Sequence, residues 1–258
     1  MKSILRWGAT LGLIGTTLFG PSLAGMNRAI ALPQEDILDK LRMVPVFTIT
    51  DAQGAPLIAS YPNSQQGGDS SSVAGVFISR QDALEFIENL ETRNPDLADE
   101  VRVTPISLAE IYQLTYSSES PSLRVSYVPT QEQVEAAVAT LQADGEQVEQ
   151  FRGVPLFIAS GSDEQGYLTI QRGDRQFIPL FFDKEQLLTM VDRFKQQQPD
   201  LTVEVEVVQL EGVLQALRQG DEPQLDRLVL IPSRESLQFV RSLQQSGNSD
   251  APQPQLGN

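Results

Sequence analysis

The chain carries an internal duplication that fixes how it can fold. Four short anchors recur in the same order, and the two copies of each anchor lie 103 to 112 residues apart. The anchors are Val44-Pro45-Val46-Phe47 with Val154-Pro155-Leu156-Phe157, Asp51-Ala52-Gln53-Gly54 with Asp163-Glu164-Gln165-Gly166, Pro95-Asp96-Leu97 with Pro199-Asp200-Leu201, and Pro129-Thr130-Gln131-Glu132 with Pro232-Ser233-Arg234-Glu235. A period this long indicates a duplicated module, because solenoid units have only about 20–50 residues.

Both modules predict the same succession of elements. Each contains three short apolar strands, a helix, a strand, a helix, a strand and a final helix. The first long helix follows Ser79 with Asp82 in one module and Asp183 with Gln186 in the other, and both pairs resemble capping boxes. We therefore predict an α+β (mixed α/β) fold of two tandem repeats related by a pseudo-twofold axis, each a small sheet with three helices. The strand order stays open.

The predicted domain limits follow from the duplication. Residues 44–145 form repeat module 1, and residues 146–245 form repeat module 2. Residues 32–43 carry the apolar stripe of a lead helix. Residues 246–258 are rich in Gln, Pro, Gly and Asn, which is typical of a disordered tail.

Residues 1–31 resemble a secretory signal peptide. Lys2 and Arg6 come first, and an uncharged apolar run follows that is shorter than the roughly 20 residues needed to cross a bilayer. Ala29-Ile30-Ala31 fits a small-x-small cleavage site, so we expect cleavage after Ala31. An uncleaved N-terminal anchor is the alternative. No later stretch is apolar enough to cross a membrane, so we predict an exported protein with no stable membrane span.

The composition excludes several classes of function. The chain has neither cysteine nor histidine, which removes disulfides, thiol catalysis, the Ser-His-Asp triad and the usual zinc sites. Its formal net charge is −15, and an acidic surface repels phosphate backbones. We therefore expect no metal, no cofactor and no nucleic-acid partner.

Paired carboxylates are the remaining candidates for chemistry. Asp99 with Glu100, and Glu204 with Glu206, flank equivalent strands of the two modules. Residues two apart share one face of a strand, so Glu204 and Glu206 could act together in a carboxylate-based periplasmic hydrolase or small-molecule binding protein. A solvated strand face in an acidic protein explains the same residues. We therefore expect no catalytic residues and keep the hydrolase as the alternative function.

The duplication also predicts where a ligand would bind. Two copies of a module present two copies of a surface, so we expect one apolar pocket per module. The candidate lining residues are Phe77, Ile78, Phe181 and Phe182, which end the strands that lead into the first long helices. The alternative is that all four belong to the core.

Several of these motifs resemble one protein family. Val44-Pro45-Val46-Phe47, Ile78-Ser79-Arg80-Gln81-Asp82-Ala83-Leu84, Pro95-Asp96-Leu97 and Ser107-Leu108-Ala109-Glu110-Ile111-Tyr112 are similar to the 22-kDa Tic family. That family is the soluble intermembrane-space component of the chloroplast protein-import translocon, together with its cyanobacterial relatives. The resemblance covers residues 41–243.

The resemblance implies a pseudo-symmetric α+β fold with hydrophobic pockets and a non-enzymatic, chaperone-like role. The implied partners are unfolded or extended envelope and outer-membrane proteins and the envelope translocation machinery, in protein transport and outer-membrane biogenesis. The N-terminus resembles a bacterial secretory signal rather than a plastid transit peptide. This favours the periplasm, with the thylakoid lumen as a second candidate compartment.

Overall fold

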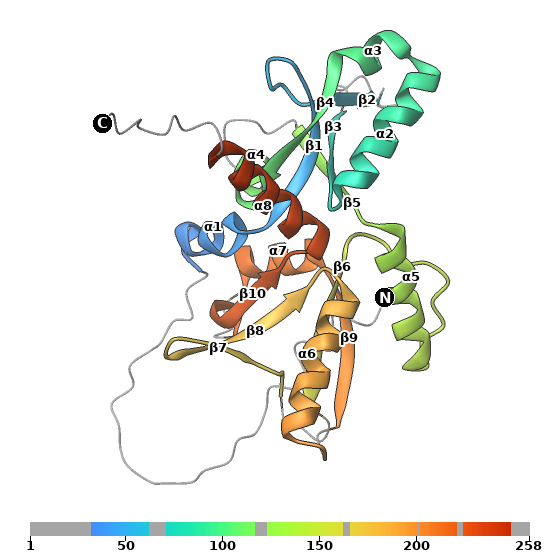
Figure 1. Cartoon of the computed structure of the whole chain (residues 1–258). Helices are drawn as coiled ribbons and strands as arrows, with labels where there is room; N and C mark the ends of the chain where they lie inside the picture. The colour runs from blue at the N-terminus through green and yellow to red at the C-terminus, as the bar shows by residue number, and fades with distance from the viewer. Residues whose placement is uncertain are drawn as a thin grey trace, which may run out of the picture.

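The computed structural model describes residues 32–61, 71–116, 123–161, 166–200, 202–220 and 224–248. Two five-stranded sheets, one per repeat, lie at opposite ends of the molecule with helices between and around them (Figure 1). The predicted α+β class and the two-repeat organisation are confirmed. The predicted signal peptide, its cleavage position at Ala31, and residues 249–258 of the predicted tail lie outside the described residues.

The two sheets have the same topology. Module 1 contains β1 (Pro45–Asp51), β2 (Ile58–Tyr61), β3 (Ser71–Phe77), β4 (Val101–Ser107) and β5 (Leu123–Val128); module 2 contains β6 (Pro155–Gly161), β7 (Ile170–Arg172), β8 (Arg175–Phe181), β9 (Val203–Gln209) and β10 (Leu228–Ile231). In each sheet the last strand pairs in parallel with the third, and the other pairs are antiparallel. The register repeats as well, because Phe47 lies opposite Phe77 and Phe157 lies opposite Phe181.

The helices also follow the predicted order, with two additions, α3 and the short 3-10 helix η1. They are α1 (Gln34–Arg42), α2 (Arg80–Arg93), α3 (Pro95–Glu100), α4 (Leu108–Tyr116), α5 (Gln131–Ala143), α6 (Lys184–Gln197), α7 (Leu210–Gln219), the 3-10 helix η1 (Leu225–Arg227) and α8 (Arg234–Asn248). The sequence analysis missed α3, which begins at a proline and is capped by the Asn94 side chain. Helix α8 continues past the predicted start of the tail to Asn248.

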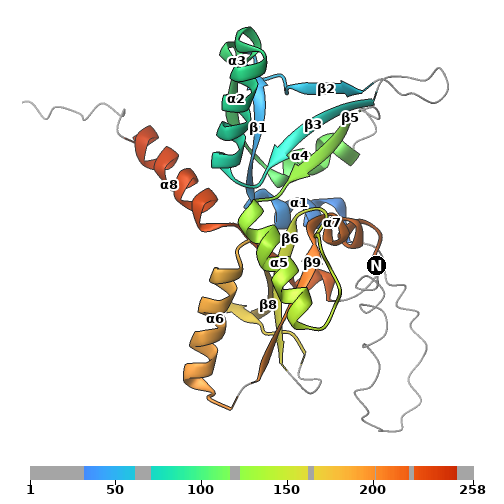
Figure 2. The ribbon, with the colours of Figure 1, turned by 90° about the vertical axis from the view of Figure 1, so that its right-hand side faces the viewer.

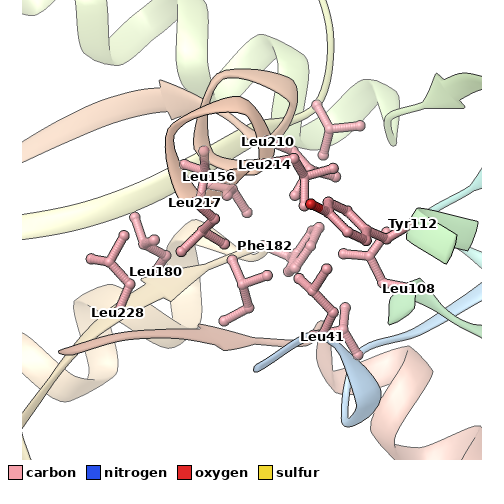
Figure 3. Packing of buried hydrophobic residues seen from close by; sticks show 14 of the residues in the cluster. Leu41, Leu108, Tyr112, Leu156, Leu180, Phe182, Leu210, Leu214, Leu217 and Leu228 are labelled. Atoms are coloured by element: carbon pink, nitrogen blue, oxygen red, sulfur yellow. The ribbon is translucent and has the colours of Figure 1, made fainter. Parts of the chain in front are cut away.

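A central core joins the two modules. The inner face of each sheet packs against α1, α4 and α7, so residues of both repeats form one buried cluster (Figure 3). Its members include Leu41, Leu108, Tyr112, Leu156, Leu180, Phe182, Leu210, Leu214, Leu217 and Leu228. Lys40 of α1 fastens this helix to module 2, because its Nζ donates to the backbone carbonyl of Leu228 at 3.3 Å. The modules therefore share a single hydrophobic interior.

The last helix of each module packs on the other module. Helix α5 leaves β5 of module 1 and lies against β6 and β9 of module 2, while α8 leaves β10 of module 2 and lies against β1 of module 1 (Figures 1 and 2). Ala137 of α5 accordingly packs with Phe157, and Phe239 of α8 packs with Phe47. We call α5 and α8 the exchanged helices.

Candidate functional site: the outer faces of the two sheets

Each sheet has an outer face, opposite the central core, which its own long helix and one exchanged helix cover. In module 1 the buried outer-face residues are Phe47, Ile49, Phe77 and Ala83. In module 2 they are Phe157, Ala159, Phe181, Leu187, Val191 and Val207, with Ala137 of the exchanged helix. The duplication is therefore seen in two equivalent buried apolar clusters, one per module. An apolar binding pocket in each module stays a prediction.

The four predicted pocket residues are divided between these faces and the central core. Phe77 and Phe181 lie on the outer faces, whereas Ile78 and Phe182 belong to the central cluster, because consecutive residues point to opposite sides of a strand. All four are at most 6% exposed. The structure thus brings Phe77 to Phe47 and Phe181 to Phe157. Their part in binding a ligand stays a prediction.

The exchanged helices cap the long helices of the module that they join. Gln133 of α5 accepts from the backbone N–H of Lys184, at the start of α6, at 3.0 Å, and its amide donates to Glu185 at 3.3 Å. Glu235 of α8 accepts from the backbone N–H of Gln81, at the start of α2, at 3.2 Å. These contacts satisfy amide groups that a helix start otherwise leaves unpaired. The two modules therefore complete one another reciprocally.

Ser236 of α8 makes a buried hydrogen bond to module 1. It is 1% exposed, and its Oγ donates to the backbone carbonyl of Ile78 at 3.1 Å. The same position in α5 is occupied by Gln133. A buried hydroxyl is stable at such a place only because it finds an acceptor.

The carboxylate of Asp82, at the start of α2, is incompletely hydrogen-bonded. One of its oxygens is buried and has no hydrogen-bond partner. Burial, and then the charges of Glu85 and Glu235, raise the pKa of the Asp82 carboxyl above its ordinary value. The equivalent residue of α6, Gln186, has no such penalty because its amide donates to Asp183 and to the carbonyl of Pro232.

Apolar side chains remain exposed beside the outer faces. Phe86 of α2 is 43% exposed, although its ring also lies edge-on to Phe77 with 5.6 Å between centroids. Leu188 of α6 and Leu243 of α8 are exposed to a similar degree. The apolar periodicity of these helices does not reveal which of the residues stay in solvent, because that depends on the tilt of each helix over its sheet.

An open groove of about 410 Å³ lies between α5 and residues 149–151 of the segment that follows it. This segment joins the two modules, and its Phe151 faces Val134, Val138 and Ala139 of the helix. Glu135 and Glu149 line the same groove. None of the four predicted pocket residues lines it.

The candidate carboxylates lie on two separate elements, α3 of module 1 and β9 of module 2. Glu206 accepts from Ser160 Oγ at 2.9 Å across the β6–β9 pair, and Glu204 is exposed on the same strand. Asp99 and Glu100 end α3 at the surface of module 1. Within the described ranges no group of three or more acidic side chains could hold a metal ion. Glu204 and Glu206 lie on one face of strand β9, whereas Asp99 and Glu100 lie at the exposed end of a helix.

No helix in the described part of the chain is both long and apolar enough to cross a bilayer.

Comparisons with known proteins agree on one family. The model of the Tic22-like family matches residues 6–242. Two Arabidopsis thaliana proteins are similar in sequence. "Protein TIC 22-like, chloroplastic" is 23% identical over 207 residues, which cover 78% of this chain and 61% of that protein. "Protein TIC 22, chloroplastic" is 24% identical over 200 residues, with 77% and 68% covered. The chain therefore spans about two thirds of the length of these relatives.

Two solved structures share the fold. "Anabaena Tic22 (protein transport)" superposes with a TM-score of 0.72 at 30% identity, covering 86% of this chain and 99% of that one. Tic22 from Plasmodium falciparum superposes with a TM-score of 0.60 at 18% identity, covering 81% and 98%, and this second likeness is one of fold.

Proposed function

The chain belongs to the Tic22-like family, and we propose that it acts as a non-enzymatic, chaperone-like factor in protein transport across the envelope and in outer-membrane biogenesis. Its clients would be unfolded or extended envelope and outer-membrane proteins, delivered to or taken from the envelope translocation machinery. Its compartment would be the periplasm. The solved Anabaena relative carries the description "protein transport", which supports the transport role.

One observation carries the chaperone-like part of this proposal. The fold holds two equivalent apolar outer faces, each closed by a helix borrowed from the other module, with Phe86 and Leu188 exposed beside them. Apolar area that is closed by separate helices, rather than buried in the central core, suits a protein that binds unfolded chains transiently. The carboxylate pairs offer no comparable support for hydrolysis.

Suppression of aggregation tests the chaperone-like role. A urea-denatured outer-membrane protein is diluted into buffer with and without the full chain, at about 50 mM and about 500 mM salt, and light scattering is recorded. We expect suppression at both salt concentrations, because apolar burial tolerates salt whereas attraction between exposed charges is screened. No suppression at either concentration would remove the proposal.

Two surface variants sharpen this test. Phe86→Ser and Leu188→Ser each remove an exposed apolar side chain beside an outer face, and we expect each to weaken suppression. Met43→Ser is the control, because Met43 is 76% exposed on the C-cap of α1, away from both faces. Equal weakening by all three variants would show that binding is not located at the outer faces.

Export is tested on the native protein. Cleavage after Ala31 gives a mature chain that begins at Leu32-Pro33. N-terminal sequencing of the protein from a periplasmic extract should return that sequence. A retained Met1 in a cytoplasmic fraction would exclude the periplasmic assignment.

A further inference from the structure

The two exchanged helices each cover an outer face, but they differ in how much of the helix is buried against it. In α5, Gln133, Ala137 and Thr140 are all buried, so contact with module 2 continues along the helix. In α8, Ser236 of the first turn is buried, Phe239 and Val240 are half-buried, and Leu243 is 47% exposed. Figure 2 shows the difference directly, because α5 lies along the strands of module 2 whereas α8 points away from module 1.

The contacts of α8 with module 1 are concentrated in its first two turns. The Phe239 ring lies edge-on to Phe47 with 5.4 Å between centroids, and the Arg80 guanidinium lies 5.0 Å from the centre of the Phe239 ring. The remaining hydrogen bonds are those of Glu235 and Ser236 to the start of α2 and to the end of β3. Phe239 is therefore the aromatic residue through which α8 packs on the sheet of module 1.

What lies beneath α8 is the apolar outer face of module 1. Phe47 is 0% exposed and belongs with Ile49, Phe77 and Ala83 to one cluster, on which Phe239 packs from outside. Movement of α8 away from the sheet would expose the part of this face on which Phe239 packs, while α2 stays in place. It would also break the bond from Ser236 to the carbonyl of Ile78, a residue of the central cluster.

The connection into α8 is built to keep the helix intact if it moves. The carbonyl of Pro232 accepts from Gln186 at 3.2 Å, so the chain is held to module 2 just before α8. One residue later, Ser233 Oγ accepts from the backbone N–H of Ser236 at 3.2 Å, which caps the helix with its own residues. Rotation about the backbone at Ser233 would therefore swing α8 as a formed, capped unit once Arg234 releases Asp183 and Thr189 of module 2.

We propose that α8 is a displaceable strap, and that an apolar client segment bearing an aromatic side chain replaces it on the outer face of module 1. The client ring would take the place of Phe239, between Phe47 and the Arg80 guanidinium, because that place already accommodates an aromatic ring with a cation over it. The outer face of module 2 stays closed under α5. This inference rests on the proposed function and names its binding site.

The variant Phe239→Ala should improve client binding if α8 is a strap, whereas loss of a purely structural contact would not improve it. Removal of the ring weakens the docking of α8, so the site opens more often and half-maximal suppression of client aggregation should need about tenfold less protein. Val191→Ala is the matched control, because it damages the outer face of module 2 and leaves α8 in place. Equal gain in both variants, or reduced suppression by Phe239→Ala, would overturn the strap.

Opening itself is measured separately from client binding. The chain has no cysteine, so Ala83→Cys places a single thiol on α2, in the module 1 cluster against which Phe239 packs, and Ala159→Cys places one on the outer face of module 2. Both parent residues are at most 2% exposed. Adding Phe239→Ala should speed modification of the module 1 thiol about tenfold and leave the module 2 thiol unchanged. Excess denatured client should slow the module 1 reaction again.

The two experiments separate the strap from the function. Aggregation suppression that is identical in the natural chain and in Phe239→Ala keeps the proposed function and removes the strap. Faster thiol modification without any suppression keeps the opening of α8 and removes the client. Unchanged thiol modification overturns the strap whatever the client assay shows.

Discussion

The ring of Phe239 lies edge-on to the ring of Phe47, although the two residues belong to different repeats. The partner position in the other half of the molecule is Phe157, which packs with Ala137 of the other exchanged helix. Each repeat therefore completes its outer face with the last helix of the other repeat. We expect the two halves to unfold as one unit.

Truncation of the two equivalent phenylalanines should cost similar stability. Phe47→Ala and Phe157→Ala each leave a large cavity in a fully buried site, so each should lower the free energy of unfolding by roughly 3–5 kcal/mol. Urea unfolding of the full chain measures this. Met43→Ala, at an exposed position, should change stability by less than about 0.5 kcal/mol. A loss below about 1 kcal/mol at Phe47 would mean that the site is open in solution.

Replacing Asp82 with glutamine, which is the residue at the equivalent position of module 2, should stabilise the chain. In module 2 the amide of Gln186 donates to the carbonyl of Pro232. Because Pro129 is the counterpart of Pro232, we expect the new amide of Asp82→Gln to donate to the carbonyl of Pro129. The variant also loses a carboxylate whose pKa is raised by burial and by Glu85 and Glu235. We expect a gain of about 0.5 kcal/mol at neutral pH, kept small by solvent screening of this half-exposed group.

The gain from Asp82→Gln should depend on pH in a defined direction. A carboxyl whose pKa is raised by folding costs stability as the pH rises from its ordinary value of 3.8 through its raised value. The part of the advantage that comes from removing the carboxylate should therefore be absent below about pH 3.8 and complete at neutral pH, whereas a hydrogen bond made by the new amide does not depend on pH. Urea unfolding of both proteins across this range tests it, and an advantage that is independent of pH would exclude the electrostatic cause.

Loss of the Gln133 side chain should loosen a helix of the other repeat. Gln133→Ala removes the acceptor of the Lys184 backbone N–H, so the start of α6 should fray at a cost of about 0.5–2 kcal/mol. Hydrogen exchange should speed up at the first turn of α6 and stay unchanged at the first turn of α2. Faster exchange at both helices would indicate general destabilisation.

Two glycines with positive φ should differ in their tolerance of a methyl group. Gly145 and Gly153 have φ of 86° and 80°, where an alanine costs about 1–2 kcal/mol. At Gly145 the space around a Cβ is open, whereas at Gly153 a Cβ would lie 2.6 Å from Glu211 Oε2. Glu211 also accepts from the backbone N–H of Val154 at 3.2 Å.

Gly153→Ala should therefore cost more stability than Gly145→Ala, because Glu211 must move and release Val154. Thermal unfolding of the two variants makes the comparison. In the double variant Gly153→Ala with Glu211→Ala, the alanine at 153 should cost only the backbone penalty. If it does not, the contact with Glu211 is not the cause.

The repeat pattern was sufficient to predict the order of elements but not the exchange of helices. Anchors such as Pro129 and Pro232 mark where the last helices begin, and local signals end there. The destination of α5 and α8 depends on which sheet offers matching apolar area, and residues such as Ala137 or Phe239 are compatible with either sheet. Strand order was equally beyond reach, because it is decided by pairing between distant strands.

Capping shows the same limit on a smaller scale. Ser107 and Glu110 form a capping box at the start of α4, with hydrogen bonds in both directions. Thr130 stands at the N-cap of α5 but makes no side-chain cap bond, and Gln133, three residues later, instead reaches the other repeat. A local signal is reliable where its partners are local, and fails where a distant group competes for them. The same limit applies to Phe77 and Ile78. Consecutive residues of a strand point to opposite faces, but only the packed sheet decides which face is the outer one.

The bond from Ser236 to Ile78 joins residues 158 positions apart. A chain that emerges from a ribosome or crosses a membrane N-terminus first cannot make this bond until almost all of it has passed. Module 1 therefore has no early route to its finished state, since loop closure over such a distance must wait for the last helix. In a chain delivered N-terminus first, the exchange of helices thus delays completion of module 1 until α8 has arrived.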